Sequence, residues 1–169
     1  ICLLNTFAST FALEPIQKVV FHYSGESNST GRAYVSRGAT ETLMLGEFNF
    51  SGIVYNDGGS RFEITITNQT RRVHIEFDSG TDKPLRPGVY KGAVRYGFNR
   101  IGDPRPGLNF SMDHRANNQV SGEFVVLEAK YNPDYGFETF AANFTQFGDN
   151  GLKEFGSIRL NSIVPLSVP

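Results

Sequence analysis

Short runs in which apolar and polar residues alternate recur along most of the chain, and clusters of glycine, proline and asparagine separate them. One such run places Val73, Ile75 and Phe77 on one side, with His74 and Glu76 on the other. Successive side chains of a β-strand point to opposite faces, so this alternation is the period of a strand with one buried face. The pattern therefore predicts a chain built from strands.

The alternating runs predict about ten strands at a spacing of roughly 8–12 residues, which is typical of an antiparallel sandwich or barrel. No stretch shows the 3.6-residue apolar period of a helix. The clearest local signal is Asn56-Asp57-Gly58-Gly59 between two strand-like runs, which predicts a hairpin. We therefore predict an all-β fold, an antiparallel β-sandwich of jelly-roll type, with a closed calycin-like β-barrel as the alternative.

Three runs of residues predict specific features of individual strands. Residues 43–50 predict a strand with a bulge or a close backbone approach at Gly46. The run 87–98 predicts a strand with Tyr90 and Val94 on one face and Ala93 on the other. Residues 124–127 are continuously apolar, which predicts a central strand that is covered on both faces.

The length of 169 residues suits one ordinary domain, and 15 Phe and 7 Tyr are ample to fill a single core. Residues 1–12 hold the single cysteine, Cys2, in an apolar run that ends on small residues, as a truncated secretory signal peptide does. We expect a single all-β domain over residues 13–162 and a C-terminal tail over residues 163–169. The signal predicts a secreted protein, in the periplasm or outside the cell.

The net charge and the hydropathy of the chain limit the classes of partner that it is expected to bind. A net charge of -1 and a pI near 6.3 give no long-range positive field, which argues against nucleic acid as a partner. Beyond residue 12, no apolar run approaches the ~20 residues that span a bilayer. We therefore expect no transmembrane segment.

Turn and strand landmarks between residues 73 and 162 carry a family resemblance. They include LRPGVY from Leu85, HRAN from His114, GEFVVLE from Gly122, FAANFTQ from Phe140 and GSIRLNS from Gly156. In these landmarks the chain resembles a widespread, unnamed family of secreted bacterial proteins of unknown function. The resemblance implies secretion and an all-β domain, and it implies no activity. The chain departs from the family pattern at Val73, where the family has tryptophan, and near Ala116 and Gly148, where two cysteines are missing.

The histidines show no catalytic or metal-binding spacing. His22, His74 and His114 belong to separate runs and have no ligand-type neighbour at the usual intervals. His22 and His74 occupy polar positions of alternating strands, so both are expected on the surface. The chain also has no G-x-S-x-G motif and no reactive cysteine after residue 12. We therefore predict a protein that is not an enzyme, with no catalytic residues and no metal site.

Carboxylates of the predicted hairpins and turns suggest two weaker interpretations. Two glutamates facing each other across a cleft would suit glycoside cleavage, but Glu123, Glu128 and Glu138 are more simply partners of basic residues on neighbouring strands. The acidic turns at Asp78 and Asp149 are compatible with a structural calcium, but neither has the density of a dedicated calcium loop. We therefore predict no cofactor.

The best candidate surface is the loop region that follows the run 87–98. Its ligand-binding candidates are Arg95, Tyr96, Arg115 and Asn117. Guanidinium and amide groups hold a carboxylate or a sugar through forked hydrogen bonds. The alternative is that Arg95 and Arg115 bind loop carbonyls and acidic neighbours and serve the fold alone.

Three hypotheses for function follow from these patterns. The first is a secreted, non-enzymatic domain that binds a carbohydrate or a partner surface through the loops around residues 95–118. The second is a structural or adhesive subunit that joins other chains by edge-strand addition. The third is a small barrel that holds an apolar ligand among its phenylalanines.

Overall fold

The structure is a computed structural model that describes residues 18–55, 59–96, 104–132 and 136–168. Within these residues the chain forms strands and turns, which confirms the all-β prediction, and no helix there has the length and hydrophobicity to cross a membrane. The strands are β1 Val19–Gly25, β2 Ser27–Asn28, β3 Gly31–Arg32, β4 Thr40–Met44, β5 Asn49–Tyr55, β6 Arg61–Thr67, β7 Arg72–Asp78, β8 Gly88–Arg95, β9 Gly107–Met112, β10 Arg115–Ala116, β11 Ser121–Asn132, β12 Gly136–Phe147 and β13 Lys153–Leu160.

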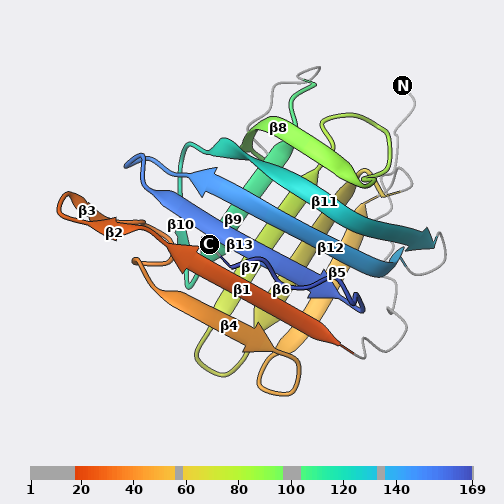
Figure 1. The fold of residues 1–169 in the computed structure, drawn as a ribbon, viewed down its shortest axis with the longest axis horizontal. Coiled ribbons are helices and arrows are strands. Elements are labelled where there is room, and N and C mark those ends of the chain that lie inside the picture. The colour runs from red at the N-terminus through yellow and green to blue at the C-terminus, as the bar shows by residue number, and fades with distance from the viewer. Residues whose placement is uncertain (1–17, 56–58, 97–103, 133–135, 169) are drawn as a thin grey trace, which may run out of the picture.

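Most of the described strands belong to one large curled sheet. Its order is β4-β1-β13-β12-β11-β8-β9-β7-β6-β5, with β10 beside β9, while β2 and β3 form a separate hairpin. The described neighbours are antiparallel except β8 and β9, which pair in parallel over Val94↔Gly107 and Arg95↔Leu108. Beyond this short join, β9, β7, β6 and β5 cross behind β11, β12, β13, β1 and β4 (Figure 1). The two strands of the predicted hairpin are confirmed as β5 and β6, which pair Val54 with Phe62, and the turn residues 56–58 lie outside the described residues.

The core lies between the two halves of the curled sheet and is rich in aromatic rings. Phe77 of β7 packs against Phe124 of β11 and against Phe140 and Phe144 of β12, at centroid distances of 5.2, 5.6 and 6.0 Å. None of the four side chains is more than 1% exposed. Burial of each large apolar side chain stabilises the fold by about 1.5–3 kcal/mol, so these rings hold the two halves together.

Two glycines change the strand pattern that simple alternation predicts. In β8, Gly92 has a φ of 68° and lies opposite a register shift between Gly122 and Glu123 of β11. The extra residue of this β-bulge reverses the alternation, so Ala93 is buried on the same side as the core and not opposite Tyr90 as predicted. Gly46, with a φ of 107°, lies in the corner between β4 and β5 and not inside one strand.

Strand β11 is central, as predicted, but it is not covered on both faces. The exposed fraction of Leu127 is 38%. A register shift between Val126 and Glu128 leaves Leu127 without a partner on β12. The continuous apolar run therefore reflects an extra bulge residue, and a fully buried strand was the wrong interpretation.

The segment after β13 folds back over the outer face of the sheet. The Arg159 side chain is 2% exposed and donates hydrogen bonds to the carbonyls of Val164 at 3.0 Å and Pro165 at 2.6 Å. The Ser167 hydroxyl accepts a hydrogen bond of 2.8 Å from Asn143 of β12. Burial lowers the pKa of Arg159. Backbone carbonyls of the tail thus accept hydrogen bonds from the Arg159 guanidinium and cover it on the outer face of the sheet.

Candidate functional site

The four residues that the sequence singles out have partners in different parts of the chain. Arg115 Nε donates to the carbonyl of Val35 at 2.9 Å, and the Asn117 side chain is 1% exposed. Arg95 donates to the carbonyl of Asn118 at 3.4 Å. The Tyr96 ring lies under the Arg61 guanidinium, 3.7 Å from ring centroid to Cζ. Arg95 and Arg115 therefore bind backbone carbonyls of loops, the Asn117 side chain is buried, and Tyr96 packs against Arg61 of β6.

The turn between β9 and β10 adopts an unusual backbone conformation. Asp113 and His114 have φ values of 49° and 65°, and the flanking residues Met112 and Arg115 pair across the hairpin. Such two-residue turns favour Asn-Gly or Asp-Gly, because both central residues adopt a left-handed conformation. A side chain in that conformation costs of order 1–3 kcal/mol, and such strain clusters at functional sites.

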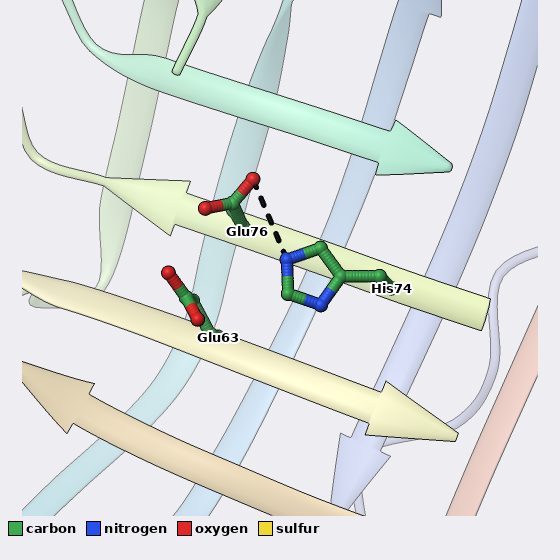
Figure 2. A group of neighbouring side chains, drawn as sticks. All are labelled: Glu63, His74 and Glu76. Atoms are coloured by element: carbon green, nitrogen blue, oxygen red, sulfur yellow. Dashed lines mark ion pairs between the residues drawn. The ribbon is translucent and has the colours of Figure 1, made fainter. Parts of the chain in front are cut away.

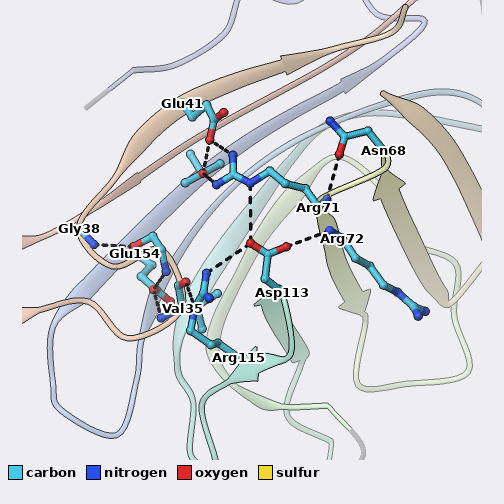
Figure 3. A network of polar contacts seen from close by, with 11 residues as sticks. Val35, Gly38, Glu41, Asn68, Arg71, Arg72, Asp113, Arg115 and Glu154 are labelled. Carbon is cyan, nitrogen blue, oxygen red and sulfur yellow. Dashed lines mark hydrogen bonds and ion pairs between the residues drawn. The ribbon is translucent and has the colours of Figure 1, made fainter. Parts of the chain in front are cut away.

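Asp113 has structural partners that explain its place in the turn. Its Oδ1 accepts a hydrogen bond of 2.9 Å from the backbone N–H of Arg72. Its Oδ2 lies 3.7 Å from Arg71 Nε and 3.5 Å from Arg115 Nη2 (Figure 3). The carboxylate thereby ties the β9–β10 turn to the start of β7. His114 is exposed, and no hydrogen bond or ion pair holds its side chain among the described residues.

A shallow polar pocket adjoins this turn on the outer face of β7 and β9. We call it the Arg72 pocket; its volume is about 240 Å³, and its lining residues are Arg72, His74, Ser111, Met112, Asp113 and His114. His74 and Ser111 are direct cross-strand partners, so the sheet fixes one wall. Arg72 is exposed, and its guanidinium extends away from the turn (Figure 3). The polar groups of the lining are thus a guanidinium, two imidazoles, a hydroxyl and the carboxylate of Asp113.

A cluster of acidic residues continues from His74 along the same outer face. Glu63 of β6 pairs directly with Glu76 of β7, and both are nearly buried, with exposed fractions of 8% and 7%. His74 Nε2 lies 3.5 Å from Glu76 Oε2 (Figure 2). Arg61 Nη2 lies 2.9 Å from Glu76 Oε1 and also pairs with Glu63. We call Glu63, His74 and Glu76 the acidic cluster.

The charges of this outer face shift the pKa of several groups. Burial acts to raise the pKa of Glu76, but the neighbouring His74, a hydrogen bond from Asn109 and the charge of Arg61 outweigh it and hold the pKa below its usual value. Burial raises the pKa of Asp78, against a hydrogen bond from the backbone of Gly80. Opposite shifts of nearby groups are common at functional sites.

Three further residues considered from the sequence, His22, Glu138 and Asp149, have defined partners in the structure, and the surface position predicted for His22 is wrong. His22, predicted on the surface, is 6% exposed and hydrogen-bonds Thr42 of the edge strand β4 at 2.9 Å, and burial lowers its pKa. Glu138 forms an ion pair with Lys130 on the neighbouring strand, as predicted for the hairpin glutamates. The Asp149 carboxylate accepts backbone N–H groups of Asn118 and Gln119 at 2.8 and 2.7 Å.

Sequence reasoning missed the acidic cluster, although a usable signal was present. Thr67 pairs with Arg72 at the turn between β6 and β7, and this register places Glu63 opposite Glu76 and Thr65 opposite His74. If residues 61–78 are treated as a hairpin with this register, the sequence predicts that the two glutamates lie opposite each other. Glu63 and Glu76 are thirteen positions apart, so their spacing in the sequence alone does not indicate that they lie together.

Comparison of the chain with protein families, with curated proteins and with solved structures gave no match. The Arg72 pocket and the acidic cluster are two polar sites of the described residues whose geometry suits binding. Both lie on strands whose apolar faces are fixed in the core, since Val73, Ile75 and Phe77 of β7 are fully buried. A rigid sheet positions polar groups more precisely than a loop does.

Proposed function

We propose that the chain is a secreted, non-enzymatic domain that binds a carbohydrate or a partner surface through the Arg72 pocket. The fold that suits this proposal is a β-sandwich of jelly-roll type, in which β9, β7, β6 and β5 form one layer. Guanidinium, imidazole and hydroxyl groups are the donors that hold sugar hydroxyls and carboxylates. Rigid strands supply Arg72, His74 and Ser111 to this pocket.

The observation that carries the proposal is the conformation of His114. Asp113 adopts a positive φ and is held by neighbouring basic groups, but His114 adopts a φ of 65° without a comparable contact among the described residues. Glycine would occupy this position at lower cost. A strained, exposed imidazole beside a polar pocket supports a role in binding.

A matched set of variants tests this binding site. Binding to a glycan array should be lost or fall by about tenfold or more in Arg72→Ala, because a charge-assisted hydrogen bond contributes about 1.5–3 kcal/mol. Arg32→Ala is the control, since Arg32 is also exposed but lies on β3, outside the pocket. Equal binding by Arg72→Ala and the wild type would refute the pocket. No binding to any glycan, by a chain that elutes as a monomer, would count against carbohydrate and partner alike.

Replacement of His114 by glycine separates function from stability. We expect His114→Gly to leave the free energy of unfolding unchanged or to raise it by up to about 1 kcal/mol, because relief of the positive φ opposes the greater freedom of glycine in the unfolded chain. Ligand binding by the same variant should weaken. Urea unfolding measures the first quantity; a loss of stability of about 1 kcal/mol or more would assign His114 to the fold instead.

The edge strand β4 favours assembly as the second candidate function. It ends the sheet next to β1; its last residue, Met44, and the following Leu45 are apolar and are 48% and 40% exposed. The strand Thr40–Met44 also lacks the lysine and proline that often protect a sheet edge. Size-exclusion chromatography distinguishes the two functions: oligomers of the wild type that dissociate in Thr42→Pro would support addition at this edge.

The interior of the fold offers little room for the apolar ligand of the third hypothesis. An apolar gap lies between β5 and the strands β1 and β13, lined by Val19, Phe50, Ser51, Gly52, Phe62, Ile64, Ile158 and Leu160. Its volume is about 10 Å³, which is at most the room that one water molecule needs. The phenylalanines around it therefore serve the core and leave no space there for a ligand.

A further inference from the structure

We propose that the acidic cluster of Glu63, His74 and Glu76 binds a divalent transition-metal ion, and that Zn²⁺ suits it best. Each residue offers one ligand atom, and these atoms all lie within 4.8 Å of one another. The three side chains project from β6 and β7 toward a common space (Figure 2). This inference does not depend on the carbohydrate proposal.

The spacing between His74 and Glu76 suits a metal better than a hydrogen bond. Nε2 and Oε2 lie 3.5 Å apart, which is long for an N–H···O bond, whose usual range is about 2.7–3.2 Å. Two tetrahedral ligands at bond lengths of about 2.0–2.1 Å are separated by roughly 3.3–3.4 Å. An ion between these two atoms needs little movement of either side chain, and Glu63 approaches from the facing strand.

Neighbouring polar groups complete the surroundings that a metal site requires. His74 Nδ1 lies 3.2 Å from Thr65 Oγ1, and a metal-bound histidine usually donates its other N–H to an oxygen in this way. Asn109 is 8% exposed and donates from Nδ2 to Glu76 Oε2 at 2.8 Å. Its Oδ1 is buried and has no hydrogen-bond partner among the described residues. Rotation of this amide would present Oδ1 to a cation at the cluster.

Electrostatics also favours an added cation. Glu63 and Glu76 face each other across the strands, and like charges in that position repel. Arg61 pairs with both carboxylates, through Oε1 in each case, so two negative charges and one positive charge leave the group at -1. Oε2 of Glu76 faces His74 and Asn109. Arg61 contacts both carboxylates of the cluster and is therefore the main competitor of the metal.

The ligand set selects the kind of metal. Imidazole and carboxylate together suit Zn²⁺ and, more weakly, Mn²⁺, because affinity along the first-row series is lowest for Mn²⁺, peaks at Cu²⁺ and is lower again for Zn²⁺. Ca²⁺ takes six to eight oxygen ligands, so a site that includes His74 is unfavourable for it. Among the described residues, this cluster is the one group of at least three such side chains that lie close enough together.

Metal binding can be measured directly with the full chain after treatment with a chelator. We expect Zn²⁺ at about a hundredfold excess over its Kd to raise the Tm by about 5–10 °C, Mn²⁺ to have a smaller effect, and Ca²⁺ to have none. Calorimetric titration should give about one Zn²⁺ per chain. In Arg61→Leu, which removes the competing cation, Zn²⁺ should bind about tenfold more tightly.

Two histidine variants make the test specific to the cluster. His74→Asn removes the imidazole from a half-buried surface position and should lower the affinity for Zn²⁺ by about tenfold or more. His114→Asn removes the exposed imidazole of the adjoining pocket and should retain the wild-type affinity. The proposal is overturned if neither the Tm nor the calorimetric heat of the wild type responds to Zn²⁺, or if His74→Asn retains the full response.

Discussion

Replacing Phe77 by alanine should lower the free energy of unfolding by about 3–5 kcal/mol. Phe77 lies on β7, and the rings it touches, Phe124, Phe140 and Phe144, belong to β11 and β12 on the other half of the curled sheet. The variant therefore leaves a cavity at the contact between the halves, where neighbouring strands cannot collapse freely. In a domain of this length the corresponding fall in Tm is about 10 °C.

The matched control for this prediction is Phe147→Ala. Phe147 ends β12 and is 39% exposed, so its truncation should cost less than about 1 kcal/mol. Urea unfolding of both variants, with equal m-values, measures the difference. A loss below about 1 kcal/mol in Phe77→Ala would contradict the packing of the two halves around this ring.

The alternation of residues predicts the strands and the core because it expresses one physical requirement, a buried apolar face. Val73, Ile75 and Phe77 are fully buried, as their spacing indicates. Alternation fails where a residue is inserted into one strand of a pair. The bulges at Gly92 and Leu127 depend on the neighbouring strand, so a run read by itself does not contain them.

The contacts of the residues singled out from the sequence depend on segments that are distant in the chain. Arg115 and Asn117 have the residue types of a binding loop, but Val35 and Glu154 come from distant parts of the chain and engage them. The sequence alternative, in which arginines bind loop carbonyls, describes Arg115 better. The sequence predicted neither a catalytic nor a metal-binding role for His114, and it does not show the positive φ of this residue.

The interior carboxylate Glu154 was also missed, and its replacement should have the second large effect on stability. It is 1% exposed on β13, and its Oε1 accepts hydrogen bonds of 2.8 Å from the backbone N–H groups of both Val35 and Ser36 (Figure 3). Its Oε2 lies 3.4 Å from Asn117 Nδ2 and 3.3 Å from Gln146 Nε2. One carboxylate thus serves four buried donors from three separate segments.

Replacing Glu154 by leucine should lower the free energy of unfolding by about 3–5 kcal/mol, because buried donors without partners cost about 1–3 kcal/mol each. Leucine has a similar volume, so the loss reports hydrogen bonding and not a cavity. Glu154→Gln is the matched control. Its amide oxygen still accepts the N–H groups of Val35 and Ser36, and the expected loss is below about 2 kcal/mol. Equal losses in the two variants would contradict this role of Glu154.

The pH dependence of the stability of Glu154→Gln, compared with that of the wild type, tests the charge of Glu154. Burial raises the pKa of Glu154, although hydrogen bonds from Ser36, Val35 and Gln146 oppose the shift. The folded state therefore binds the proton more tightly than the unfolded chain does. Stability from this group is largest below the unfolded pKa of about 4.3 and is lost as the pH rises through the folded pKa. The stability of Glu154→Gln relative to the wild type should therefore increase with pH above about 4 and then level off. Urea midpoints measured from acid to neutral pH give this difference, and a difference that stays constant or falls would show that the carboxylate is not penalised by burial.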